Sequence, residues 1–279
     1  IRQISRSEVA HAHGAGQMVD ANIEPTYLSL LRSGDLKNRV TAAQSHLQAC
    51  RLCGHNCRVD RYEKTGVCNT GEKAVVASYH PHLGEEAPIR GHHGSGTIFF
   101  SWCNLKCQYC QNDDISQQGH GQPETPEAIA EMMLELQSKG CHNINLVSPT
   151  HVTPQIVKAL YIAAQAGLHV PLVWNTGGYD SLHTLSLLED IIDIYMPDMK
   201  YADEHIAYQY SKAPEYVHVN QLAIKEMHRQ VGDLILDQDG IALRGLLVRH
   251  LVLPEGLAGT GKIAQFLAQE ISSNTYINI

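Results

Sequence analysis

The chain has 279 residues, of which 43% are hydrophobic and 18% are charged, as is ordinary for a globular protein. Its formal net charge of −8 argues against a general nucleic-acid-binding surface, which would be basic. The sequence contains no apolar run of about 18 residues, so we expect no membrane span. The polar first residues do not resemble a signal peptide, and we expect a cytoplasmic protein.

Residues 1–48 are predicted to form an N-terminal arm followed by helices. Residues 1–24 are polar and lack periodicity, which favours an extended arm. Helices are expected over 25–32 and 36–49. The second helix has apolar residues at the spacing of an amphipathic helix, and we expect this stripe to pack against the main domain: Leu36, Val40, Ala43 and Leu47.

Residues 49–72 form a Cys-rich segment that contains Cys50, Cys53, Cys57 and Cys68. Cysteines grouped in this way, in a chain without a secretion signal, indicate a metal site in a reducing compartment rather than disulfides. Four ligands close a metal site, so we expect a structural or electron-transferring role. The spacing leaves zinc and an iron–sulfur cluster as alternatives.

Residues 73–95 are expected to connect this segment to the main domain and to include a strand near 73–79. Glu85 and Glu86 follow in a loop, where they either face the active site or are solvated. From residue 96 to 279 strands and helices alternate, which predicts an α/β fold with a parallel sheet, closed or partly closed as a barrel. The expected strands are 97–102, 142–147, 170–174, 191–196, 246–252 and 275–279, and the expected helices begin near 125, 153, 180, 203, 220 and 261.

The first of these strands leads into a three-cysteine loop with Cys103, Cys107 and Cys110 in a C-x3-C-x2-C pattern. A [4Fe–4S] cluster normally takes four Cys ligands. Three ligands leave one iron open, as in a catalytic metal site. Reductive cleavage of S-adenosylmethionine to a 5′-deoxyadenosyl radical needs such an iron. The alternative is a zinc site with one distant ligand, but zinc sites favour paired C-x2-C motifs.

Polar and small residues follow five consecutive predicted strands, where the active site of a (β/α) barrel lies. The functional groups of S-adenosylmethionine suggest a role for each residue. Lys200 suits the carboxylate, and Asp198 suits the ribose hydroxyls or the sulfonium. The other candidates are Ser148 and Thr150 for the amino group, Asn175 and Thr176 for the ribose, Tyr109 for the adenine, and His250 for the methionyl part or the substrate. An alternative for Asp198 and Lys200 is a simple ion pair at the barrel rim.

Five stretches resemble the radical S-adenosylmethionine superfamily, and within it proteins similar to pyruvate formate-lyase activating enzyme that have a Cys-rich segment before the barrel. These stretches are C-R-L-C-G-H-N-C-R-V-D-R, G-S-G-T-I-F-F-S-W-C-N-L-K-C-Q-Y-C-Q-N, N-I-N-L-V-S-P-T-H, D-I-Y-M-P-D-M-K-Y and R-H-L-V-L-P. The resemblance implies a partial (β/α)6 TIM-like barrel over 96–279, a [4Fe–4S] cluster, S-adenosylmethionine and a one-electron donor such as flavodoxin or ferredoxin. It also supports cofactor contacts by Asp198, Lys200 and His250.

The second predicted strand departs from the activating-enzyme pattern. Activating enzymes usually carry Gly-Gly-Glu after it, whereas this chain has Ser148-Pro149-Thr150-His151. We therefore favour a radical enzyme that acts on another, unidentified substrate. The alternatives are an activating enzyme that installs a glycyl radical on a partner protein, and a non-enzymatic iron–sulfur protein for electron transfer or scaffolding.

Overall fold

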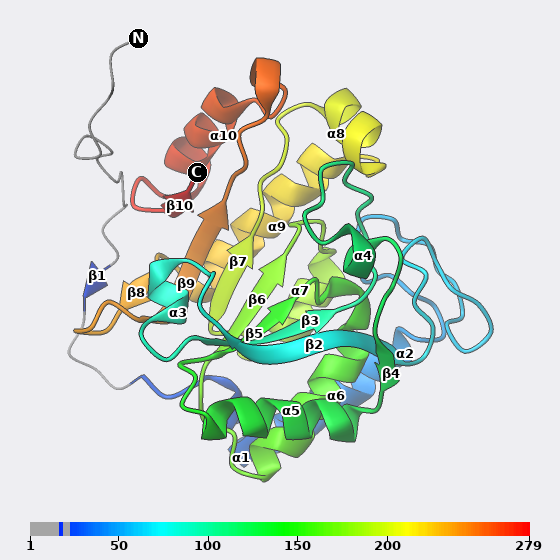
Figure 1. Cartoon of the computed structure of the whole chain (residues 1–279), viewed down its shortest axis with the longest axis vertical. Coiled ribbons are helices and arrows are strands. Elements are labelled where there is room, and N and C mark those ends of the chain that lie inside the picture. The colour runs from blue at the N-terminus through cyan, green and yellow to red at the C-terminus, as the bar shows by residue number, and fades with distance from the viewer. Residues whose placement is uncertain (1–16, 19–22) are drawn as a thin grey trace.

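The computed structural model describes residues 17–18 and 23–279 (Figure 1). Most of the arm expected over residues 1–24 lies outside the described residues. In the described part of the chain, no helix is both long and apolar enough to cross a membrane.

Six parallel strands form the centre of the fold, as the alternation of strands and helices predicted (Figure 1). They neighbour one another in chain order, which brings their carboxyl ends to one edge of the sheet. These strands are β3 (Ser95–Phe100), β5 (Ile144–Val147), β6 (Leu172–Thr176), β7 (Ile194–Pro197), β9 (Ala242–Arg249) and β10 (Tyr276–Asn278).

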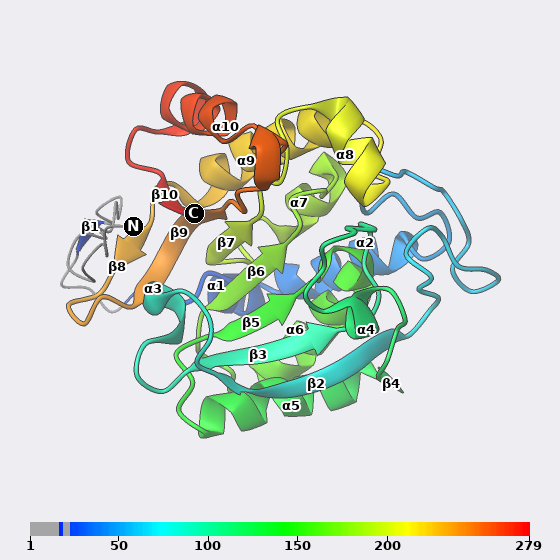
Figure 2. The same ribbon diagram turned by 45° about the horizontal axis from the view of Figure 1, so that its top comes forward.

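Shorter or antiparallel strands extend both sides of this parallel sheet. On one side β2 (Ala74–His82) pairs antiparallel with β3, and β4 (Gln122–Glu124) pairs with β2. On the other side β8 (Ile235–Leu236) pairs antiparallel with β9 and carries β1 (Gln17–Met18). The described strands do not close into a ring, so the fold is the expected partial TIM-like barrel (Figure 2). Residues 73–95 contribute β2 and therefore belong to the sheet.

Helices follow the strands and cover the outer face of the curved sheet (Figure 2). Three of them begin at a side-chain cap: Thr125, Ser181 and Asp203 accept hydrogen bonds from the third residue that follows. The helices of the barrel are α5 (Pro126–Ser138), α6 (Thr153–Gln165), α7 (Leu182–Leu188), α8 (Glu204–Ser211), α9 (Tyr216–Val231) and α10 (Thr260–Phe266), which continues as a π-helix over Leu267–Ile271. Two single-turn helices that were not predicted, α3 (Ala87–Arg90) and α4 (Asp113–Ser116), follow β2 and the three-cysteine loop.

The two N-terminal helices, α1 (Tyr27–Ser33) and α2 (Asp35–Ser45), pack against the barrel, and α2 does so through the predicted stripe. Leu36, Ala43 and Leu47 are buried. Gln44 donates a hydrogen bond to the Pro154 carbonyl of α6 over 2.9 Å. Packing against the main domain is thus confirmed for this part of residues 1–48.

Candidate active site

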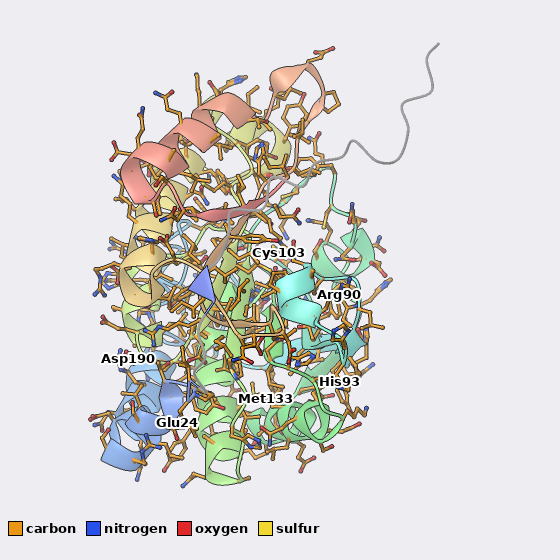
Figure 3. All side chains as sticks on the ribbon, turned by 90° about the vertical axis from the view of Figure 1, so that its left-hand side faces the viewer. Glu24, Arg90, His93, Cys103, Met133 and Asp190 are labelled. Atoms are coloured by element: carbon orange, nitrogen blue, oxygen red, sulfur yellow. The ribbon has the colours of Figure 1, made fainter. Side chains whose placement is uncertain are left out.

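The three-cysteine loop occupies residues 101–110, directly after β3. Its backbone is held on both sides by neighbouring elements. Trp102 adopts a left-handed φ of 66° and donates its N–H to the Ile115 carbonyl of α4 over 3.0 Å. Lys106 and Gln108 donate their N–H groups to carbonyls of α8, at 2.8 and 2.9 Å. These bonds fix the loop at the carboxyl edge of the sheet, and Cys103 lies well inside the outline of the molecule (Figure 3).

Each sulfur of the loop has a neighbouring hydrogen-bonding group. The Leu105 N–H donates to the Cys103 sulfur over 3.4 Å. The Ser211 hydroxyl donates to the Cys107 sulfur over 3.0 Å, and the Ser116 hydroxyl lies 3.1 Å from the Cys110 sulfur. Burial raises the pKa of Cys103 to about 11, and the Leu105 N–H and the Lys200 charge act in the opposite direction. Hydrogen bonds and a nearby cation favour the thiolate, which is the form that binds iron. The donor set therefore fits a thiolate-ligated cluster.

A cavity of about 690 Å³ lies between this loop and the carboxyl ends of the parallel strands. Its volume falls within the range of about 300–1,000 Å³ that is usual for ligand sites. Ten of the eleven residues predicted for the iron–sulfur cluster and S-adenosylmethionine line it: Cys103, Cys107, Tyr109, Cys110, Ser148, Asn175, Thr176, Asp198, Lys200 and His250. The eleventh, Thr150, does not.

Four charged side chains on the cavity wall form a network in which positive and negative groups alternate. Lys200 donates to Asp198 over 2.6 Å, and Arg249 donates to the other oxygen of Asp198 over 3.1 Å. Arg249 also lies 3.7 Å from Glu85. Burial alone would raise the pKa of Asp198, but the charges of Lys200 and Arg249 hold it below its ordinary value. Asp198 is therefore ionised, and the network presents fixed charges to the cavity.

Glu85 ends this network and comes from the loop after β2. Its side chain is 8% exposed and accepts a hydrogen bond from Asn145 over 3.0 Å. Burial raises its pKa to about 7, against the opposing effect of the Arg249 charge. The sequence left open whether Glu85 and Glu86 face the active site or are solvated. In the structure both residues line the cavity.

Thr150 and Thr176 use their hydroxyls to hold a buried carboxylate. Both donate to Asp180, over 2.8 and 2.7 Å, and Trp174 donates its indole N–H to the same carboxylate over 3.0 Å. Asp180 is 1% exposed. The structure thus gives Thr150 a partner away from the cavity, whereas Ser148 lies on its wall.

Both ring nitrogens of His250 have partners in the protein. Nδ1 lies 2.6 Å from the Met199 carbonyl, which can only accept, so Nδ1 carries the proton. Nε2 then accepts from the Thr260 hydroxyl over 2.8 Å. His250 therefore joins the end of β9 to the loop after β7 and to α10.

No role was predicted for Arg249, although it is one of the central groups of the site. It joins Asp198, Glu85 and Asn175, and its bond to the Asn175 side-chain oxygen is 2.6 Å long. An arginine inside the apolar run Leu246–Val252 was the available signal, because a charge in a buried strand needs partners.

The Cys-rich segment lies against this same edge of the barrel. Gly54 donates its N–H to the Tyr179 carbonyl after β6 over 3.3 Å, and Ser181 donates to the Leu52 carbonyl over 3.2 Å. Cys50, Cys53 and Cys68 are buried, and Cys57 is partly exposed. Among the described residues, no three His, Cys, Asp or Glu side chains are placed as ligands of one metal ion.

Residues 97–222, from β3 into α9, match the family model described as the radical SAM superfamily. This part of the chain is therefore similar to radical SAM domains. Such a domain implies an enzyme with radical chemistry that uses a [4Fe–4S] cluster and S-adenosylmethionine. The chain is also similar to the uncharacterized protein MJ0674 of Methanocaldococcus jannaschii, with 29% identity over 266 residues. That alignment covers 92% of this chain and 72% of the relative.

Proposed function

We propose that the protein is a radical SAM enzyme that abstracts a hydrogen atom from a substrate other than a glycyl-radical enzyme. The observation that carries the proposal is the cavity itself. It combines the three sulfurs of the three-cysteine loop with a cation, Lys200, and a carboxylate, Asp198, on one wall. S-adenosylmethionine carries groups that complement each of them.

In this proposal Cys103, Cys107 and Cys110 hold three irons of the cluster. When bound and reduced, the cluster supplies the electron that cleaves S-adenosylmethionine to methionine and a 5′-deoxyadenosyl radical. Lys200 binds the methionyl carboxylate, and Ser148 accepts a hydrogen bond from the amino group. Asp198 binds the ribose hydroxyls. These contacts fix the direction of the cleaved bond, since orientation is a large part of such catalysis.

Tyr109 is proposed to lie along the adenine. It directly precedes the last cysteine and lines the cavity, and its ring meets Tyr201 edge-on at 6.3 Å. Asn175 is proposed as a further ribose contact. Its amide nitrogen donates to Glu85 over 3.5 Å, which is long for a hydrogen bond, so a ligand oxygen can replace this weak partner.

The test is anaerobic reconstitution with iron and sulfide, followed by addition of S-adenosylmethionine and dithionite. We expect 5′-deoxyadenosine from the parent and none from Cys103→Ala. The matched control is Cys141→Ala, which removes a buried thiol far along the chain from the loop and should leave product formation as in the parent. Absence of product from a parent with an intact, reducible cluster would contradict the proposal and favour the electron-transfer or scaffold alternative.

The second candidate is activation of a glycyl-radical enzyme, for which the likeness of the three-cysteine loop to activating enzymes is the reason. It differs from the first in its substrate alone. Incubation with a glycyl-radical enzyme such as pyruvate formate-lyase separates the two: a glycyl-radical EPR signal would support this candidate. We expect no such signal, because Ser148-Pro149-Thr150-His151 replaces the usual Gly-Gly-Glu.

A further inference from the structure

The Cys-rich segment has little regular structure, yet Cys53 interacts electrostatically with each of the other three cysteines, Cys50, Cys57 and Cys68. Cys50 donates its N–H to the Val59 carbonyl over 3.0 Å and accepts from the Arg58 N–H over 2.8 Å. Gly66 lies so close to Cys57 that a methyl group there would stand 2.8 Å from the sulfur. The two ends of the segment are thus folded back on one another around the sulfurs.

Two of these sulfurs receive the same backbone contact as Cys103 of the three-cysteine loop. Burial raises the pKa of the Cys50 and Cys53 thiols, and N–H groups that hydrogen-bond their sulfurs act in the opposite direction. The donors are Leu52 and His55, each two residues after its cysteine, as Leu105 is after Cys103. Donors at this spacing stabilise a thiolate that ligates a metal.

A buried cation points to an anion in the same segment. Arg61 is 2% exposed, and two of its nitrogens donate to the carbonyls of Thr70 and His151. Its third nitrogen, Nη2, is buried without a hydrogen-bond partner, and within the described residues no carboxylate lies within 4.0 Å of the guanidinium. Buried charges are normally paired. A thiolate-ligated metal group, which is negatively charged, would supply the missing partner.

The arrangement of the sulfurs favours one of the two metals that the sequence left open. A zinc ion needs its four ligands around one point, and no three ligand side chains of the described residues are so placed. In a [4Fe–4S] cluster each cysteine binds a different iron. The cysteines of the three-cysteine loop likewise do not converge on one point.

We propose that Cys50, Cys53, Cys57 and Cys68 hold a second iron–sulfur cluster, which passes electrons to the cluster of the three-cysteine loop. His55 donates from Nε2 to the Asn104 carbonyl of that loop over 2.8 Å. Cys53 packs in one apolar cluster with Leu105 and Tyr179, against which Cys103 and Cys107 also pack. The two groups of cysteines are therefore neighbours.

The transfer balances as two one-electron steps. A donor of the flavodoxin or ferredoxin class is oxidised by one electron and reduces the second cluster. The second cluster is then reoxidised as the cluster of the three-cysteine loop is reduced. The relay rests on the proposed function, whereas the presence of the second cluster does not.

Metal analysis tests the cluster. The triple variant Cys103→Ala, Cys107→Ala, Cys110→Ala, reconstituted anaerobically, should keep about four irons per chain and give an EPR signal after reduction by dithionite. The quadruple alanine variant of the Cys-rich segment should lose the same amount of iron relative to the parent, which covers the case in which the triple variant does not fold. Cys141→Ala should retain all the iron. Bound zinc without iron in the triple variant, or parental iron in the quadruple variant, would overturn the proposal. No step of this test uses S-adenosylmethionine, so its outcome is independent of the proposed function.

Kinetics test the relay. The ratio of 5′-deoxyadenosine formed with reduced flavodoxin to that formed with dithionite should fall at least about tenfold in the quadruple variant, which corresponds to about 1.4 kcal/mol. An unchanged ratio would overturn the proposed relay, whereas the proposal of a second cluster would stand.

Discussion

Arg249 donates its Nε to Asp198 over 3.1 Å, and this pair joins β9 to the loop after β7 across the candidate active site. The same guanidinium contacts Asn175 and Glu85, so one side chain of β9 organises residues from three other elements. The position of Asp198 relative to Lys200 therefore depends on a residue outside the ligand set.

Arg249→Gln should lower the free energy of unfolding by about 2–4 kcal/mol, because it leaves the buried Glu85 without its cation and Asp198 with Lys200 alone. Urea denaturation measures this change. Arg229→Gln is the matched control: Arg229 pairs with Glu189 and Glu226 on the surface, where ion pairs contribute about 0–1 kcal/mol. Equal losses in the two variants would show that the network contributes nothing to stability.

Glu85 predicts a specific dependence of stability on pH. Its pKa is about 7 in the folded protein and 4.5 as the ordinary value, so between these values the unfolded chain releases a proton that the folded chain keeps. Stability is therefore highest below about pH 4.5 with respect to this group, falls as the pH rises to about 7, and stays reduced above. The loss of unfolding free energy between pH 4.5 and 7 should be smaller in Glu85→Gln, by up to about 3 kcal/mol. Thermal melts over this pH range measure the difference. The control is Glu131→Gln on the exposed face of α5. A parental pH profile in Glu85→Gln would contradict the expectation.

Gly178 should not tolerate a side chain. It has a φ of 72°, and a methyl group there would lie 2.2 Å from the Asn220 side chain and 2.4 Å from the Asp198 carbonyl. Gly140 has a similar φ of 82° with open space around it. Gly140→Ala thus measures the backbone cost alone, about 1 kcal/mol, and Gly178→Ala should cost about 2–4 kcal/mol and weaken S-adenosylmethionine binding as Asp198 shifts. Similar unfolding energies for the two variants would mean that the site accommodates the methyl group.

Ser148 and Thr150 should separate binding from stability. Ser148→Ala is expected to weaken S-adenosylmethionine binding about three- to tenfold with little change in unfolding energy, since Ser148 lines the cavity. Thr150→Val removes a donor to the buried Asp180 and should cost about 1–2 kcal/mol of stability. Calorimetric titration and urea denaturation of both variants check this. Loss of affinity without loss of stability in Thr150→Val would reverse the assignment.

The order of strands and helices followed from the sequence because central parallel strands such as β5, β6 and β7 are short buried runs and several helices begin at a clear cap such as Thr125-Pro126. The site followed less completely. Residues after a strand share an edge, so Ser148, Asn175 and Asp198 were expected together. The partner of each side chain is a matter of tertiary packing, which is why Thr150 turned out to hold Asp180 and His250 to hold Met199 and Thr260. β8 and β4, with two and three residues, are too short to leave a periodic pattern.

The hydrogen bond from His55 to the Asn104 carbonyl sets a limit on how far the enzyme can be trimmed. A fragment that began at the first parallel strand would expose the Asn104, Tyr179 and His151 carbonyls, which now accept donors from residues 54, 55 and 61. All three lie on the loops that shape the cavity. The smallest working unit should therefore start ahead of Cys50, and engineering of this scaffold should treat the Cys-rich segment as a support for the loops of the active site.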